Sequence, residues 1–212
     1  MQSDQKSAAD RNNGIEILSR SYQLYTPPQA ERVELDLGCG SGYFAVELAK
    51  RFPERHILAA DVMLGRLRKT VTRKNHAGIT NVTPLRVEAR MLVGRMLHDN
   101  SIDRLHLLCP DPWPKGKHRG HRLLTSDFTA RIHRVLKEDG IFHFSSDDIN
   151  YVQAVTAVVA ASGLFAPVDA AECAADLAGL TTSFERRWLA QGKPVHHFYW
   201  RRLPLPPKTI GH

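Results

Sequence analysis

The residues best suited to chemistry fall into three groups, and the first is a glycine-rich turn. It reads Asp36-Leu37-Gly38-Cys39-Gly40-Ser41-Gly42 and follows a short apolar run. Alternate glycines let the main chain bend tightly and let a ligand approach the backbone. The spacing is GxGxG, which differs from the GxGxxG of dinucleotide-binding turns. Asp36 would repel a pyrophosphate but would attract an ammonium group.

Two further acids each close an apolar run. Asp61 follows residues 56–60, and an acid at this place in a nucleoside-binding fold accepts hydrogen bonds from ribose hydroxyls. Asp61 could instead cap the next helix. Glu88 follows residues 82–87, where it would bind an adenine amino group or cap a short helix. Together with the glycine spacing, Asp36 and Asp61 favour S-adenosylmethionine over NAD as the cofactor.

The second group runs from Cys109 to Arg122 and contains Pro110-Asp111-Pro112-Trp113, followed by six basic or histidine side chains. The prolines stiffen the chain and hold Asp111 just beyond an apolar run. An acid there would meet a methyl acceptor. Trp113 would stack on a base or close the pocket, and the basic side chains would hold phosphates. The alternative is a proline-rich turn with a solvated charged loop.

Alternating apolar runs and helical patterns position these groups. Short apolar runs predict strands over 33–37, 56–60, 82–87, 102–109, 141–144 and 195–200. Helical patterns and caps predict helices over 43–52, 64–77 and 89–97, from Ser126 to just before Gly140, and from Asp147 or Asp148 to Gly163. This order predicts an α/β Rossmann-like fold, with a mostly parallel sheet covered by helices on both faces. Ligands of such sheets bind beyond the carboxyl ends of the strands.

The composition is that of a globular protein with an excess of basic residues. The 29 Lys+Arg against 22 Asp+Glu give a net charge of +7 and a pI near 9.5, which favours a polyanionic partner. Five basic residues fall on the predicted helix over 64–77, which would contact an RNA backbone or form a solvated charged face: Arg66, Arg68, Lys69, Arg73 and Lys74.

Length and residue usage narrow the remaining possibilities. The 212 residues fit one domain, expected over 31–203, with a loosely ordered segment over 1–30 and a tail over 204–212. The chain has no apolar run of membrane-spanning length and no signal-peptide pattern, so we expect a cytoplasmic protein. Cysteines 39, 109 and 173 lack zinc-site spacing, so we expect no metal and no disulfide. We also expect a monomer.

From Val33 to at least Tyr151 the chain resembles the bacterial tRNA (guanine-N7)-methyltransferase family. The PDPW signature of that family stands here as residues 110–113, and its KxxH pattern as Lys115 and His118. Its TD element resembles Ser146-Asp147. A late T-x-F-E-x-R element, the third group, matches Thr182-Ser183-Phe184-Glu185-Arg186-Arg187.

The resemblance implies a class I methyltransferase that transfers a methyl group from S-adenosylmethionine to N7 of a guanine in the variable loop of tRNA. It implies that Asp111 is the active-site acid. The cofactor would be bound by Asp36, Gly38, Gly40, Gly42, Asp61, Glu88 and Asp111. The tRNA would be bound by Lys115, Arg122, Asp147, Thr182, Ser183, Phe184 and Glu185. Read without the family, Asp147 and Glu185 also fit ordinary capping and salt bridging.

Several positions depart from the family pattern: Gly120 and His121 in the basic loop, Asp148 after the TD acid, and Arg187 after the FExR element. These departures affect RNA contacts more than cofactor contacts. Methylation of another acceptor and a non-enzymatic RNA-binding module are therefore the competing functions. A binding module would not need Asp36, Asp61 and Asp111, and all three acids are present.

Overall fold

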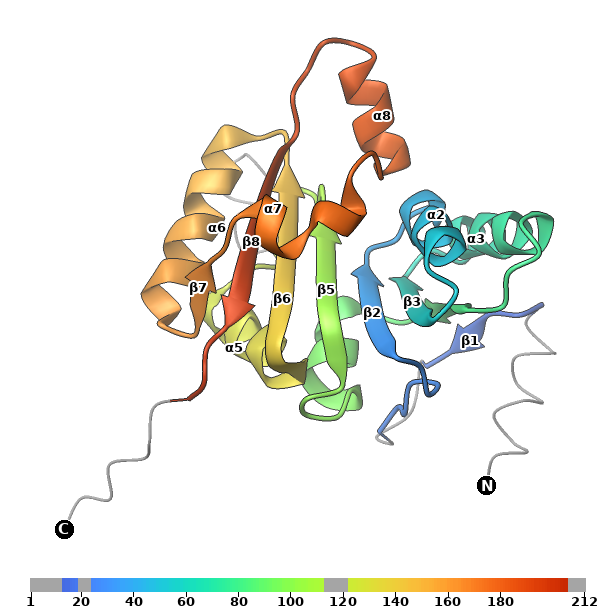
Figure 1. Ribbon diagram of the computed structural model, residues 1–212, viewed down its shortest axis with the longest axis horizontal. Helices are drawn as coiled ribbons and strands as arrows, with labels where there is room; N and C mark the ends of the chain where they lie inside the picture. The colour runs from blue at the N-terminus through green and yellow to red at the C-terminus, as the bar shows by residue number, and fades with distance from the viewer. Residues whose placement is uncertain (1–12, 19–23, 113–121, 206–212) are drawn as a thin grey trace.

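The computed structural model describes residues 13–18, 24–112 and 122–205, and in this part of the chain eight strands form one sheet (Figure 1). The order is β1-β4-β3-β2-β5-β6-β8-β7. Neighbours from β1 to β6 are parallel, whereas β8 is antiparallel to both β6 and β7. The strands are β1 Glu16–Ile17, β2 Arg32–Leu37, β3 Arg55–Asp61, β4 Val82–Arg86, β5 Ile102–Leu108, β6 Leu136–Ser146, β7 Phe165–Pro167 and β8 His196–Arg202.

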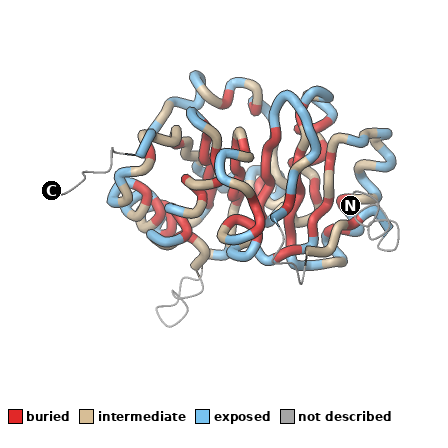
Figure 2. The backbone as a smooth tube through the Cα atoms, turned by 90° about the horizontal axis from the view of Figure 1, so that it is seen from below, coloured by how far each residue is buried: buried red, intermediate tan, exposed pale blue. Residues whose placement is uncertain are grey.

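Helices cover both faces of this sheet, which confirms the predicted fold class. The helical segments are α2 Tyr43–Arg51, α3 Leu64–His76, α4 Ala89–Met91, η1 Leu92–Met96, α5 Ser126–Val135, α6 Ile149–Ser162, α7 Ala170–Cys173, η3 Ala175–Leu177 and α8 Ser183–Leu189. One core cluster packs η1, α5 and α6 on the sheet, and the other packs α2, α7 and η3 on the opposite face. Figure 2 shows the buried strands enclosed by more exposed helices.

Helix ends differ from the predictions in two places. Thr125, and not Ser126, caps α5, because its hydroxyl accepts a hydrogen bond from the Phe128 amide. Gly140 does not end that helix, because the extended backbone of β6 already begins at Leu136. A Cβ at Gly140 would lie 2.8 Å from the Lys137 carbonyl oxygen, so this glycine serves a close backbone approach.

Other caps agree with the sequence. Of the two aspartates considered for the start of α6, Asp148 is the cap, and its carboxylate accepts from the Tyr151 amide at 3.0 Å. Gly163 ends α6 in the left-handed conformation, with a φ of 65°. Asp147 is therefore free of any capping role in α6.

Several elements were not predicted, among them the helix α8 over Ser183–Leu189. The two-residue strand β1 pairs with β4 and adds an edge to the sheet, and Tyr25 is buried and bridges to Leu97. The elements β7, α7 and η3 also lack a clear sequence signal, because each spans only three or four residues.

Among the described helices, none is long and apolar enough to cross a membrane.

Candidate active site

A cleft of about 470 Å³ opens where four neighbouring parallel strands end. Its walls come from the segments after β2, β3, β4 and β5, which the parallel register brings to one edge of the sheet. Four residues predicted from the sequence line it: Gly38, Asp61, Glu88 and Asp111. The apolar part of the wall includes Leu37, Ala60, Val62, Val87, Leu107, Leu108 and Leu123.

The three glycines of the first turn all have positive φ angles: 84° at Gly38, 57° at Gly40 and 69° at Gly42. A Cβ at Gly38 or Gly40 would meet nothing within 4 Å, so these two glycines leave open space beside the backbone. Gly42 is different, because a Cβ there would lie 2.4 Å from the Thr70 hydroxyl oxygen. Gly42 thus lets α2 and α3 pack together, whereas Gly38 keeps the cleft open.

Asp61 ties the glycine turn to the next helix. One carboxylate oxygen accepts from the Gly40 amide at 3.0 Å, and the other accepts from the Met63 amide at 2.8 Å. The N-cap position of α3 is Met63, so Asp61 supports the helix start without being its cap residue. Each carboxylate oxygen has a second lone pair, and Asp61 lines the cleft, so it can also accept from a ligand hydroxyl.

Asp36 lies behind this turn, at the end of β2, and is 3% exposed. Its Oδ2 atom is buried and has no hydrogen-bond partner. Burial, and then the nearby charge of Asp61, raise the pKa of Asp36 to about 7. A positively charged ligand group would favour the ionised form of this carboxyl.

Glu88 takes the capping role that the sequence left open. Its side chain accepts from the Met91 amide at 2.9 Å and so caps α4. The same residue lines the cleft, and its second carboxylate oxygen remains an acceptor for an amino group.

Asp111 is exposed and lies in the cleft wall just beyond β5. The chain turns there through Cys109, which has a φ of 48° and donates its amide to the Ser145 carbonyl at 2.9 Å. Arg122 donates its Nε–H to the Pro112 carbonyl at 2.8 Å. Its guanidinium also lies 4.9 Å from the centre of the Tyr151 ring. Trp113, Lys115 and His118 lie outside the described residues.

The late segment lies beside the glycine turn through α8. The Ser183 hydroxyl is 3.2 Å from the Ser41 hydroxyl, and Trp188 donates its indole N–H to Asp147 at 2.7 Å. The Phe184 and Trp188 rings pack with centroids 4.4 Å apart. The structure thus brings Asp147 and the 182–185 segment together, at the same edge of the sheet as the cleft.

Thr182 and Glu185 form a capping box at the start of α8. The Glu185 amide donates to the Thr182 hydroxyl at 3.0 Å, and Glu185 Oε2 accepts from the Thr182 amide at 3.3 Å. The other Glu185 oxygen accepts from His197 Nε2 at 2.8 Å. The capping and pairing alternative considered for Glu185 is therefore formed in the structure.

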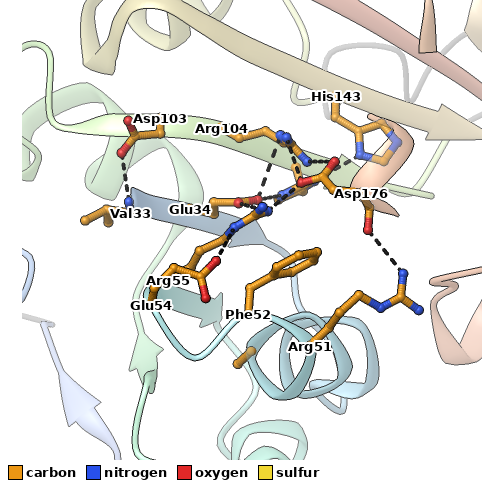
Figure 3. A network of polar contacts seen from close by, with 12 residues as sticks. Val33, Glu34, Arg51, Phe52, Glu54, Arg55, Asp103, Arg104, His143 and Asp176 are labelled. Atoms are coloured by element: carbon orange, nitrogen blue, oxygen red, sulfur yellow. Dashed lines mark hydrogen bonds and ion pairs between the residues drawn. The ribbon is translucent and has the colours of Figure 1, made fainter. Parts of the chain in front are cut away.

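A buried polar network across the sheet was missed by the sequence analysis. Figure 3 shows the side chains of Glu34, Arg55, Arg104 and Asp176 converging on one another. Arg55 Nη1 is 2.9 Å from Glu34 and 2.5 Å from Asp176, and both Arg104 Nη atoms donate to Asp176. Charged residues inside strands that otherwise read as buried were the available signal, because an unpaired buried charge is costly.

These residues fit S-adenosylmethionine. The open backbone at Gly38 and Gly40 leaves room for a ligand. Among the described residues, Asp36 Oδ2 has no hydrogen-bond partner, and the ion pair of Asp61 is with Arg66 at 3.7 Å. The ligand's ammonium and sulfonium are cations, and its ribose and adenine match acceptors such as Asp61 and Glu88. Among the described residues, no group of acids, histidines and cysteines is arranged to hold a metal ion.

Solved methyltransferase structures share this fold. A 16S rRNA methyltransferase, KamB, superposes with a TM-score of 0.59 at 19% identity, over 83% of this chain and 90% of that one. An S-adenosylmethionine-dependent methyltransferase from Aquifex aeolicus superposes with a TM-score of 0.56 at 16% identity, over 82% and 84% of the two chains. At these identities the likeness establishes the fold.

Sequence comparison identifies the family. The methyltransferase family model Methyltransf_4 matches residues 30–198. The chain is 38% identical to the tRNA (guanine-N(7)-)-methyltransferase of Syntrophotalea carbinolica, over 80% of this chain and 74% of that protein. It is 34% identical to the enzyme of the same name from Neisseria gonorrhoeae, over 84% and 71% of the two chains. The chain therefore belongs to the tRNA (guanine-N7)-methyltransferase family.

Proposed function

We propose that this protein transfers the methyl group of S-adenosylmethionine to N7 of a guanine in tRNA. The observation that carries the proposal is one cleft whose wall holds Gly38, Asp61, Glu88 and Asp111 at the carboxyl ends of adjacent strands. The printed names of the relatives and the net charge of +7 support tRNA as the substrate. A guanine in the variable loop, a cytoplasmic location, a monomeric state and independence from metal belong to the same proposal.

The reaction makes modest demands on acid–base chemistry. Guanine N7 carries an in-plane lone pair and attacks without losing a proton, so no general base is needed. S-adenosylmethionine supplies an electrophilic methyl group on a sulfonium. The protein must place N7 in line with this methyl group and offset the positive charge that develops on the purine. Asp111, exposed in the cleft wall, provides the negative charge and also an acceptor for guanine donors.

Cofactor binding uses the acids behind and beside the glycine turn. The carboxylate of Asp36 would pair with the ammonium of the methionine moiety, which favours its ionised form. Asp61 would accept from the ribose hydroxyls while it holds the Gly40 amide. Glu88 would accept from the adenine amino group while it caps α4.

Acceptor recognition uses the segments around α8 and the loop after Asp111. Carboxylates match the N1–H and amino donors of guanine better than they match phosphate. Asp147 is exposed and accepts only from Trp188 among the described contacts, so it is better placed than the buried Glu185 to accept from the guanine donors. The 182–185 segment would frame the base, and Arg122 and Lys115 would contact the RNA backbone.

The test replaces Asp111 by Asn, which keeps the shape and removes the charge. Turnover with unmodified tRNA and labelled S-adenosylmethionine should fall by roughly 10²–10³-fold, far more than the calorimetric affinity for the cofactor falls. Nucleoside analysis should find 7-methylguanosine with the unaltered protein. Asp127→Asn, at an exposed acid paired with Arg131 on α5, is the matched control.

Each outcome distinguishes one explanation from another. Equal loss of turnover and cofactor affinity in Asp111→Asn would contradict the catalytic role. Tight cofactor binding by the unaltered protein without 7-methylguanosine would point to another acceptor. Failure of the unaltered protein to bind the cofactor would favour a non-enzymatic RNA-binding module.

A further inference from the structure

A continuous chain of hydrogen bonds crosses the sheet face that carries α2 and α7. It begins at Glu34 Oε2, which is 2.8 Å from His106 Nε2, and passes from His106 Nδ1 to His143 Nδ1 at 2.9 Å. His143 Nε2 is 2.9 Å from His197 Nδ1, and His197 Nε2 is 2.8 Å from Glu185 Oε1. The chain thus links four adjacent strands, β2, β5, β6 and β8, to the start of α8.

Most of this chain is shielded from water. Glu34 and His106 are 0% exposed, His143 is 2% exposed and Glu185 is 6% exposed. The Phe44 ring packs edge-on against His106, and Tyr199 stacks on His143 with centroids 4.4 Å apart. Only the His197 side chain, which is 26% exposed, has substantial contact with solvent.

The number of protons that these hydrogen bonds require determines the charge of the five linked side chains. Four hydrogen bonds join five side chains, and each bond needs one proton. The two carboxylates bring no proton when ionised, and each neutral imidazole brings one. Three protons cannot serve four bonds, so one histidine must be doubly protonated.

The buried neighbours decide which histidine this is. Burial would raise the pKa of Glu34, but the hydrogen bond from His106 and the charges of Arg104 and Arg55 outweigh it and keep this carboxyl ionised. Burial lowers the pKa of His106 and also that of His143. Both are therefore neutral, with His106 protonated on Nε2 and His143 on Nδ1. His197 must then donate in both directions.

Glu185 gives this arrangement a consequence at the site. The same carboxylate closes the capping box of α8, so the bond from His197 ties the helix start to β8. The other described ties of α8 to the fold are few: the Ser183 contact with Ser41, Arg186 over the Tyr43 ring, and the Trp188 bond to Asp147.

We propose that His197 is a positioning residue, which as an imidazolium holds Glu185 and so fixes the 182–185 segment for the RNA substrate. The proposal rests on the function proposed above for that segment. Loss of the extra proton would remove one hydrogen bond from the chain and loosen α8. Other charged and titratable groups lie around these hydrogen-bonded side chains, on the strands and helices packed against them. They are Arg55, Arg104, Cys109, Asp147, Cys173, Asp176 and Tyr199.

The first test is spectroscopic and needs no variant. Side-chain ¹⁵N–¹H correlation spectra of the full chain at pH 7 should show His197 protonated on both nitrogens, His106 on Nε2 only and His143 on Nδ1 only. A neutral His197 in these spectra would overturn the proposal. This measurement does not depend on which RNA, if any, the protein methylates.

The second test uses variants. His197→Gln and Glu185→Gln should each raise the KM for tRNA at least tenfold and speed amide hydrogen exchange in α8, while the Kd for S-adenosylmethionine stays within twofold. His196→Gln, at an exposed neighbour on β8, is the matched control and should change none of these. Unchanged exchange in α8 in both variants would refute the positioning role. Absence of methyl transfer by the unaltered protein would instead contradict the proposed function, and the spectra and exchange rates would still decide this inference.

Discussion

Replacing Gly42 by Ala tests whether this glycine serves the packing of α2 against α3, whereas Gly38 serves ligand binding. Gly42 has a φ of 69°, which an L side chain adopts at a cost of about 1–2 kcal/mol. Its Cβ would also lie 2.4 Å from both Oγ1 and Cγ2 of Thr70 and 2.7 Å from Thr70 Cβ. Thr70 is 0% exposed on α3, so it cannot move into solvent.

The expected loss of stability combines these two effects. Overpacking of a buried contact costs about 1–3 kcal/mol, so Gly42→Ala should lower the free energy of unfolding by about 2–5 kcal/mol in all. Gly38→Ala has a similar backbone cost, since its φ is 84°, but meets nothing within 4 Å. It should lose only about 1–2 kcal/mol of stability. The added methyl group would lie in the cleft, so Gly38→Ala should weaken cofactor binding more than Gly42→Ala does.

Urea unfolding and calorimetric titration with S-adenosylmethionine measure the two quantities. Thr70→Ala should recover part of the stability lost in Gly42→Ala, because two of the three close atoms are removed and the third remains. Equal destabilisation by Gly38→Ala and Gly42→Ala, without recovery in the double variant, would refute the assignment of the cost to Thr70.

Two further predictions concern buried charges. Because the pKa of Asp36 is 3.8 unfolded and about 7 folded, the unfolded state releases its proton first as pH rises. The stability of the free protein should therefore fall between pH 4 and 8 by up to about 4 kcal/mol. Asp36→Asn should lack this fall in urea unfolding, and parallel profiles of the two proteins would contradict the shift. Asp176→Ala should cost roughly 3 kcal/mol of stability, because it leaves Arg55 and Arg104 without a main partner. Glu47→Ala, which breaks an exposed pair with Lys50, should cost less than about 1 kcal/mol, and a similar loss in both variants would argue against the buried network.

The sequence predicted the parts of the fold that repeat a strong local pattern. The strands that end at Leu37 and Asp61 and the helices after them appear where their apolar periods place them, because parallel strands buried on both faces are nearly all apolar. The cap of α5 was placed one residue too late, since Thr125 and Ser126 carry the same hydroxyl. Short elements such as β1 and η3 depend on tertiary pairing, which a single sequence does not display.

The candidate site was predictable for a different reason. Residues after parallel strands must meet at one edge, so the topology alone brings Gly38, Asp61, Glu88 and Asp111 together. The pairing of Glu185 with His197 was not predictable, because it joins α8 to β8 by a tertiary contact. The histidine chain likewise depends on strand order, which places His106 beside His143 only once β5 and β6 pair.

The connection between β7 and β8 is a part of the fold whose length can vary. Antiparallel neighbours need a turn of only a few residues, yet here the chain inserts residues 168–195, which contain α7, η3 and α8. Loop closure becomes only slowly more costly as a loop lengthens, so this insert can vary in length while the sheet keeps its register. Residues 168–195 can therefore be replaced by a segment of another length without a change in strand pairing. Contacts with the rest of the fold limit such changes, among them those of Asp176 with Arg55 and Arg104 and that of Glu185 with His197.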